Sequence, residues 1–208
     1  RVHVPMRVMS SPQELAAFAD EILNIEDRPN DPMYFQATAV GDALLAAEEA
    51  MSEGRVLARD YVIDISGDGV LNDGRDVGPA RAHVLSRGLV VNGLPIELAS
   101  STPSVNDAGT FETVSQFYAD CVIGGPGSFH LVARGFGDVR ETLIMKLMLE
   151  MAEMPAADKT RIARAWNSGA GSDIARIVPA MVIELAPSGP APAPNADCGS
   201  AAPLVFIP

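Results

Sequence analysis

The sequence predicts an α/β fold built around a mostly parallel sheet. Strand-like apolar runs alternate with helical patterns along most of the chain, at the spacing expected of strand–helix–strand units. One run, DYVIDIS at residues 60–66, is apolar enough to indicate burial on both faces, as in a parallel sheet. Because crossovers between parallel strands are almost always right-handed, we expect right-handed connections between these units.

Local signals along the chain define the predicted elements. In chain order they are a strand over residues 1–9, a helix over 12–26, a helix over 38–54, a strand over 60–66, a helix over 76–88, a strand over 89–97, a short helix over 115–123, a strand over 128–135, a long helix over 136–154 and a short helix over 156–166.

The first strand and helix rest on an alternating pattern followed by helix-start signals. The opening residues, RVHVPMRVM, alternate and are rich in β-forming residues. Ser10 or Ser11 stands where a cap is needed, and Pro12 lies in the first turn of the helix. Acidic residues follow early, where the helix dipole favours them, and DRPNDP at residues 27–32 breaks the helix.

The later elements are bounded mainly by glycine. Residues 38–54 are rich in Ala and Leu and reach a stop at Gly54, and the helix over 76–88 ends at Gly88. The helix over 136–154 is the longest helical pattern in the chain. After it the composition changes to a Pro- and Ala-rich end that suits neither a regular helix nor a central strand.

This change in composition predicts two regions. Residues 1–154 form the α/β domain, and residues 155–208 form an irregular C-terminal extension. The extension starts with the short helix and continues as the Pro/Ala-rich tail. We expect it to pack on the domain or on a partner.

Composition excludes two classes of partner. The formal net charge is −12, and only two of the 15 basic residues are lysines, which argues against binding to a nucleic-acid backbone or an anionic membrane surface. Hydrophobic residues make up 48% of the chain, but no apolar run approaches the roughly 20 residues of a membrane span.

The ends of the chain and its cysteines suggest export. The chain opens without Met and without a signal peptide, as a trimmed product does, so we expect a bacterial-type exported protein, periplasmic or extracellular. Cys121 and Cys198 are too far apart for a redox or zinc motif. They are either unrelated thiols or one disulfide. We expect a bridge, because an irregular tail needs an anchor, and a bridge implies an oxidising compartment.

The stretch YVIDISGDGVLNDG, residues 61–74, carries the candidate site. Ligands bind at the carboxyl ends of strands in open α/β sheets, and Asp68 follows such an end. Gly67 and Gly69 allow backbone angles that aim its carboxylate, and carboxylate and hydroxyl oxygens suit Mg²⁺ or Ca²⁺. The alternative is a loop in which Asp, Asn and Gly only build turns. Asp64, inside the strand, is expected to have a hydrogen-bonding partner.

Three stretches of the chain carry a resemblance. TAVGDAL (38–44), RDYVIDISGDGVLNDGR (59–75) and VNGLPIE (91–97) followed by FYADCVIGGPGSF (117–129) resemble the von Willebrand factor type A domain. They are most similar to a bacterial branch known only as a domain of unknown function. The resemblance runs from the first residue to about Met154. It implies a three-layer, doubly wound sheet of Rossmann type.

The resemblance also implies a metal-ion-dependent adhesion site that holds Mg²⁺ or Ca²⁺. Thr38 matches the family's threonine ligand, Asp68 matches its later aspartate, and Ser66 lies just before Asp68 at the strand end. The family's Asp-x-Ser-x-Ser loop does not occur in these 208 residues. In the family it follows the first strand, so its counterpart would lie upstream of Arg1, and the fold of this chain is expected to be incomplete.

A missing central strand implies a partner. It would leave a hydrophobic strand edge unpaired, so we expect another polypeptide to fill the gap. The leading candidate is the N-terminal piece of the same precursor, bringing the remaining metal ligands. The alternative is an unrelated subunit that donates a strand.

The functional expectation is a non-enzymatic, protein-binding module of the adhesion type. A ligand's carboxylate would complete the coordination of the cation. The runner-up is a structural or assembly subunit with a vestigial metal site. A metal-dependent hydrolase using Asp68 ranks last, because the sequence shows no convincing general base.

Overall fold

In the computed structural model, the residues described are 4–24, 38–54, 57–98, 104–106, 109–111, 113–152 and 154–170. The helices are α1 (Pro12–Leu23), α2 (Val40–Gly54), α3 (Val77–Ser86), α4 (Val114–Phe117), α5 (Val139–Met151) and α6 (Ala156–Ala165), and the strands are β1 (Val62–Gly67), β2 (Val90–Pro95), β3 (Ser104–Asn106) and β4 (Gly109–Phe111). Shorter helical turns span Tyr118–Val122, Phe136–Asp138 and Trp166–Ala170.

The described elements mix helices and strands around a small parallel sheet, which is compatible with the α/β prediction. β1 and β2 pair in parallel, in a register that runs from Val62 opposite Val90 to Gly67 opposite Pro95. β3 and β4 form a separate antiparallel hairpin. The larger, doubly wound sheet is not confirmed, because the parallel sheet of the described residues has two strands.

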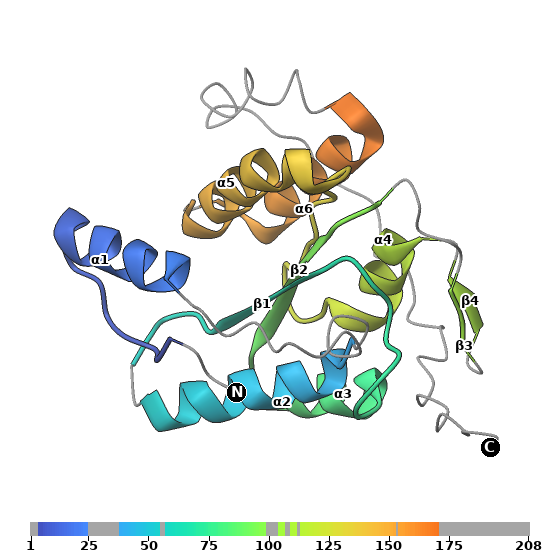
Figure 1. Ribbon diagram of the computed structural model, residues 1–208, viewed down its shortest axis with the longest axis horizontal. Coiled ribbons are helices and arrows are strands. Elements are labelled where there is room, and N and C mark those ends of the chain that lie inside the picture. The colour runs from blue at the N-terminus through green and yellow to red at the C-terminus, as the bar shows by residue number, and fades with distance from the viewer. Residues whose placement is uncertain are drawn as a thin grey trace.

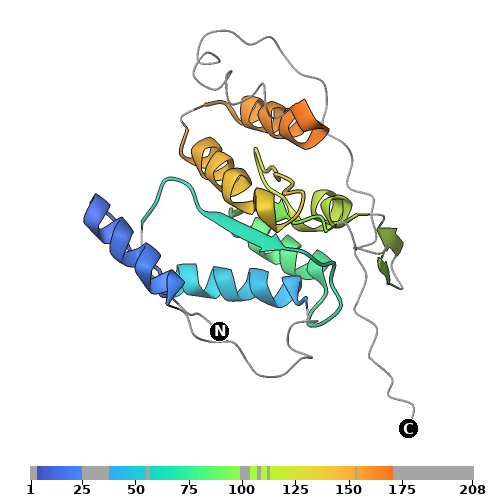
Figure 2. The same ribbon diagram turned by 45° about the horizontal axis from the view of Figure 1, so that its top comes forward.

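Helices lie on both sides of the strand pair. Figures 1 and 2 show α2 and α3 on one side of β1 and β2, and α5 and α6 on the other. On the first side, Ile63 of β1 is buried in a core that includes Leu44 of α2 and Val84 of α3. On the second side, Met145 and Leu149 of α5 form a separate core with the segment after α4 and with α6.

The expected burial of β1 on both faces is wrong. Ile63 is buried, whereas Asp64 and Ser66, which point to the opposite face, are exposed. A strand is covered on both faces only when helices pack over both and strands flank both edges. Among the described residues β1 pairs with β2 alone, so its second edge has no strand beside it.

Helix α1 begins as the sequence predicts. Glu14 N donates to Ser11 Oγ at 3.2 Å, and Ser10 N donates to Glu14 Oε2 at 2.6 Å, so Ser11 is the cap. The strand predicted just before it is wrong over residues 4–9, which have no regular structure. Instead of pairing with a strand, Arg7 forms an ion pair with Glu21 at 2.7 Å, which ties this segment to α1.

The strand predicted over residues 128–135 is reduced to isolated pairings with β2. His130 pairs with Gly93 and Ala133 pairs with Ile96, both in parallel. A side chain bonds the backbone of this segment: Asn167 Oδ1 accepts from Val132 N at 2.9 Å, and Asn167 Nδ2 donates to His130 O at 3.0 Å. The short helix predicted over 115–123 forms as α4 followed by a turn of π-helix.

Within the described ranges, no helix combines the length and the apolar composition needed to cross a membrane.

Candidate metal site at the carboxyl end of the sheet

Thr38, just before α2, is fixed against the loop that follows β1. Its backbone N–H donates to Asn72 Oδ1 at 2.6 Å, and Asn72 N donates to Thr38 O at 3.2 Å. Two hydrogen bonds between the same two residues hold both the position and the direction of the backbone. The start of α2 and the loop after β1 therefore form one unit.

Gly69 brings the Thr38 hydroxyl close to the loop backbone. A Cβ atom built on Gly69 would lie 2.8 Å from Thr38 Oγ1, closer than real Cβ contacts come. Only glycine fits there without a shift of Thr38. Since Gly69 follows Asp68 directly, the structure brings Thr38 and the loop that carries Asp68 together.

The candidate oxygen donors are not engaged by other described side chains. Ser66 and Asp68 are exposed, and Thr38 is half-buried. Within the described residues, no hydrogen bond or ion pair involves the Asp68 carboxylate or the hydroxyl groups of Thr38 and Ser66. These side chains remain available for a ligand at the carboxyl end of β1.

Tyr118 lies behind this end of the sheet. A Cβ atom on Gly67 would lie 3.0 Å from the Tyr118 hydroxyl oxygen, so the phenol group is packed against the last residue of β1. Burial, with a smaller contribution from the negative charge of Asp68, raises the pKa of Tyr118 above its usual range. Its hydroxyl therefore stays protonated and supplies a neutral wall to the site.

The donors fit a hard cation in kind but not in number. One carboxylate and two hydroxyl groups are oxygen ligands of the type that Mg²⁺ and Ca²⁺ take, but these ions need about six or more ligands. The described part of the chain contains no group of three or more His, Cys, Asp or Glu side chains able to hold a metal. Any such ion would need water molecules and ligands from elsewhere.

Asp42, a nearby carboxylate on α2, is already bonded to Arg75. Its Oδ2 accepts from Arg75 N at 3.2 Å, and its Oδ1 forms an ion pair with Arg75 Nε at 3.4 Å. Gly74 has a positive φ of 77°, and a Cβ atom there would lie 2.2 Å from Asp42 Oδ2. Asp42 therefore helps to shape the loop between β1 and α3.

Asp64 has the hydrogen-bonding partner that its place in the strand predicts, and the structure shows that this partner is Lys146 of α5. Lys146 is 1% exposed, and its ammonium group donates to Asp64 and, at 2.5 Å, to Glu150 Oε1. Asn92 of β2 also donates to Glu150 Oε1, at 2.9 Å. Sequence reasoning missed this cluster, although a Lys and a Glu four residues apart on one helix were a readable signal.

A serine and a histidine also meet, which the sequence did not predict. Ser115 Oγ lies 3.2 Å from His130 Nε2, and burial lowers the pKa of His130 to about 4. The nearby carboxylate of Glu97 accepts from the backbone N–H of Ser115 at 2.7 Å. No described carboxylate is hydrogen-bonded to the His130 ring, so the pair lacks the third member of a catalytic triad.

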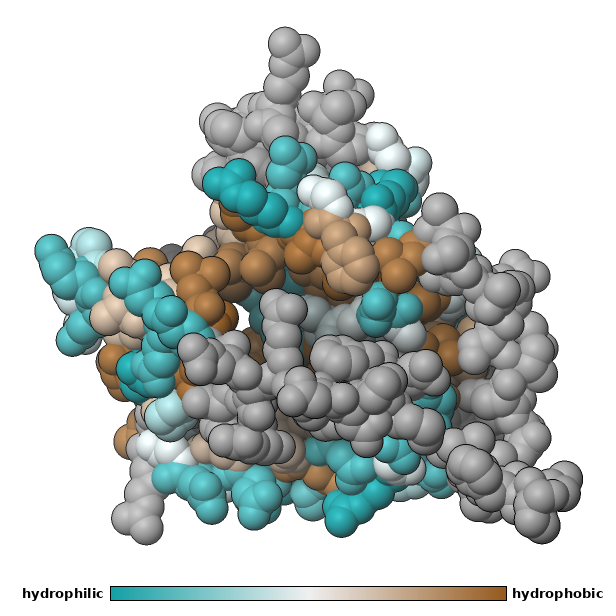
Figure 3. Space-filling view, viewed as in Figure 1, coloured by the Kyte–Doolittle hydropathy of each residue, from teal (hydrophilic) through white to brown (hydrophobic). Residues whose placement is uncertain are grey.

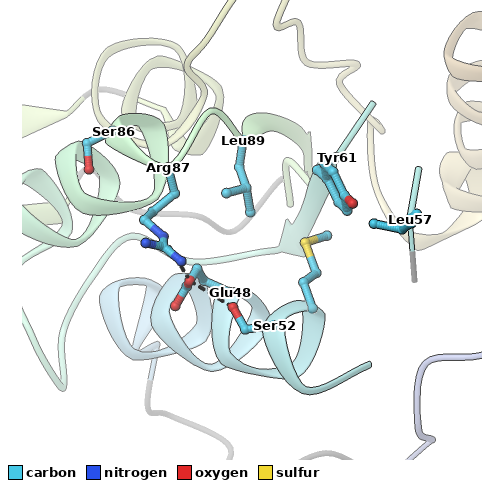
Figure 4. A pocket seen from close by; sticks show the side chains of 8 residues that line it. Glu48, Ser52, Leu57, Tyr61, Ser86, Arg87 and Leu89 are labelled. Carbon is cyan, nitrogen blue, oxygen red and sulfur yellow. Dashed lines mark hydrogen bonds and ion pairs between the residues drawn. The ribbon is translucent and has the colours of Figure 1, made fainter. Parts of the chain in front are cut away.

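A pocket between α2 and α3 has a charged wall and an apolar wall. Figure 4 shows Glu48, Ser52 and Arg87 pointing toward one another, with Leu89 and Tyr61 beyond them. Ser52 Oγ donates to Glu48 Oε1 at 3.0 Å, and Arg87 Nε lies 3.5 Å from the same oxygen. Glu48 therefore already binds two of the other polar side chains of this pocket.

The disulfide prediction concerns one described cysteine. Cys121 is fully buried in the turn after α4. Cys198 lies outside the described residues, so the Cys121–Cys198 pairing stays a prediction.

Residues 1–155 match the family described as "Protein of unknown function (DUF1194)". The chain belongs to this family. The match covers Thr38, Ser66, Asp68 and the Lys146 cluster, so both ends of the strand pair lie within the DUF1194 region. No curated protein and no solved structure matches the chain.

Proposed function

We propose that this DUF1194 protein is a protein-binding module of the von Willebrand A type that works through a divalent cation. The observation that supports the proposal is the close approach of the Thr38 hydroxyl to Gly69, the residue after Asp68, near the carboxyl end of β1. Among the described residues, the side-chain oxygens of Thr38, Ser66 and Asp68 have no hydrogen-bonding partner. Such a module would have a doubly wound sheet larger than the strand pair described above.

In this proposal Asp68 supplies the negative charge at the cation, and the hydroxyl groups of Thr38 and Ser66 supply neutral ligands. A bound Mg²⁺ or Ca²⁺ would keep one coordination position for a carboxylate of the partner protein. Asn72 positions Thr38, and Gly69 allows the close approach of its hydroxyl. The role of the chain is to bind and orient, and we propose no chemical turnover.

The proposed site needs a second polypeptide, and the surface beside β1 supports one. Five apolar side chains of α5 are exposed, with Met151 at 75%. Figure 3 shows apolar surface over the region where Figure 1 places α5. The exposed side chains are Leu143, Ile144, Leu147, Met148 and Met151.

We propose that a strand from another polypeptide pairs with the second edge of β1 and brings the remaining metal ligands. An N-terminal piece of the same precursor is the leading candidate, and an unrelated subunit is the alternative. Sizing and mass spectrometry of native material distinguish them. A lone, soluble, monodisperse 21.9 kDa monomer would contradict both.

The same apolar surface favours a second candidate function, that of an assembly subunit in which the metal site is vestigial. Both functions suit an exported protein, periplasmic or extracellular. A metal-dependent hydrolase based on Asp68 ranks below them, because no described group near Asp68 has the contacts of a general base.

A cation titration tests the proposal. With the native assembly, Mg²⁺ or Ca²⁺ is expected to raise the melting temperature, and Thr38→Ala combined with Asp68→Ala is expected to abolish that rise without unfolding the protein. Asp73→Ala is the matched control, because Asp73 is exposed on the same loop. No cation response in the intact assembly, or an equal loss in the control, would exclude the metal-dependent function.

A further inference from the structure

A cavity lies at the amino ends of β1 and β2, opposite the proposed metal site. It has a volume of about 560 Å³ and is lined by Val62 and Val90, the first residues of the two strands, and by the ends of α5 and α6. Its size falls in the range of roughly 300–1,000 Å³ that is typical of small-molecule sites.

One end of the cavity is acidic. Glu150 lines it, and its Oε1 accepts from Asn92 Nδ2 at 2.9 Å and from Lys146. Asn92 is only 3% exposed, and its Oδ1 accepts from Phe129 N at 3.0 Å, so the amide is held from both sides. No described residue donates to Glu150 Oε2, which is left as an acceptor for a ligand.

The charges behind this end favour an incoming cation. When ionised, Asp64 and Glu150 place two negative charges around the single ammonium group of Lys146. Burial, together with the charge of Asp64, raises the pKa of Glu150. An ammonium group that donates to Oε2 would stabilise the ionised form of Glu150.

A basic group lies beside this acidic end. Lys159 of α6 lines the cavity, and its ammonium group donates to Glu150 O at 3.1 Å. An ammonium group has three N–H donors, so two remain for a ligand. The first turn of α6 begins at Ala156, which also lines the cavity, and the positive end of the helix dipole favours negative charge there.

Apolar side chains make up much of the remaining lining. They are Val62, Val90, Pro126, Phe129, Met154 and Pro155. Arg59 and Asp60, which also line the cavity, form an ion pair with each other at 2.8 Å and so contribute no net charge.

We propose that this cavity binds a free amino acid with an apolar side chain. The α-ammonium group bonds to Glu150 Oε2, the α-carboxylate pairs with Lys159, and the side chain packs against the apolar lining. The site is independent of the proposed cation, because its residues lie at the opposite end of the strands.

Isothermal titration calorimetry of the whole chain with the twenty amino acids tests this site. For leucine, two analogues separate the contributions: 3-methylbutylamine lacks the carboxylate, and 4-methylpentanoate lacks the amine. Saturable binding of an apolar amino acid, with each analogue at least tenfold weaker, is expected. Binding of either analogue as tightly as leucine, or no heat with any amino acid, would overturn the proposal.

Variants test the residues. Lys159→Met is expected to weaken amino acid binding tenfold or more while leaving the affinity for the amine analogue unchanged. Arg164→Met, which changes an exposed side chain on the same helix, is the matched control and is expected to change neither. Glu150→Gln should weaken the contact with the ligand's ammonium group, but it also removes a charge from the Lys146 cluster. Lys159→Met is therefore the variant that decides whether the cavity binds an amino acid as proposed. Full affinity in Lys159→Met contradicts the assignment.

Discussion

Lys146 of α5 and Asp64 of β1 are joined by an ion pair in which the ammonium group is buried and the carboxylate is partly exposed, with exposed side-chain fractions of 1% and 40%. The pair connects the helix layer on one side of the sheet to the strand itself. The buried ammonium group depends on its partners, because an unpaired buried charge is strongly unfavourable.

Asp64→Asn and Lys146→Met test this dependence. Removing one partner of a buried pair costs about 3–5 kcal/mol, and we expect Lys146→Met to fall at the low end because Asp64 can be solvated. The double variant is expected to be more stable than the sum of the single effects predicts. Urea unfolding measures the free energy of unfolding of all three variants, with Arg164→Met, at an exposed side chain, as the control. Additive effects would show that the two side chains do not interact.

A second prediction tests the close approach of Gly69 and Thr38. Gly69→Ala places a methyl group 2.8 Å from Thr38 Oγ1, so we expect a loss of roughly 1–3 kcal/mol in the free energy of unfolding. In a Thr38→Ala background the hydroxyl is gone, and the loss should become smaller. Chemical unfolding of the four proteins in this cycle gives the coupling. The same loss in both backgrounds would place Thr38 away from the loop.

A third prediction concerns pH. Burial lowers the pKa of His130 from 6.5 to about 4, so the unfolded chain binds a proton on this side chain at a higher pH than the folded chain does. The contribution of His130 to stability is therefore fully present above about pH 6.5 and is lost as the pH falls toward 4.

The loss is up to roughly 3 kcal/mol. His130→Asn should remove this part of the pH dependence, whereas His83→Asn, at an exposed histidine, should not. Melting temperatures between pH 4 and 7.5 provide the comparison. An unchanged profile in His130→Asn would mean that His130 does not resist protonation.

A fourth prediction is the Cys121–Cys198 disulfide. Closing so long a loop stabilises the folded state by ~4 kcal/mol in the chain-entropy description. Mass spectrometry of unreduced protein treated with a thiol-alkylating reagent should show no alkylation. Alkylation of both cysteines in folded protein would refute the bridge and remove the argument for an oxidising compartment.

Features specified by neighbouring residues could be predicted from the sequence. The start of α1 is one case, because Ser11 and Glu14 lie within one turn and cap the helix together. The strand predicted over residues 4–9 failed for the opposite reason. Alternation gives a segment two faces, but a strand forms only beside another strand, and Arg7 packs on α1 instead.

Contacts between residues far apart in the sequence could be predicted only in part. The need of Asp64 for a partner followed from its place in a strand, but the identity of Lys146 depends on how α5 crosses the sheet. The resemblance paired Thr38 with Asp68 as metal ligands, but the close approach of Thr38 to Gly69 was not predicted. The Ser115–His130 pair joins α4 to the segment beside β2. Because the two residues belong to different segments, no short sequence motif predicts the pair.

Asn167 blocks one edge of the sheet. Its amide group occupies the N–H of Val132 and the C=O of His130, two groups of a kind that an added strand would use on that side. One side chain thus prevents strand addition at this edge, whereas among the described residues no strand pairs with the second edge of β1. Two molecules that associate through their sheets should therefore pair β1 with β1. Because the opposite margin of each sheet is blocked by Asn167, no third molecule can add there, so closed pairs of chains are expected in preference to open-ended fibres.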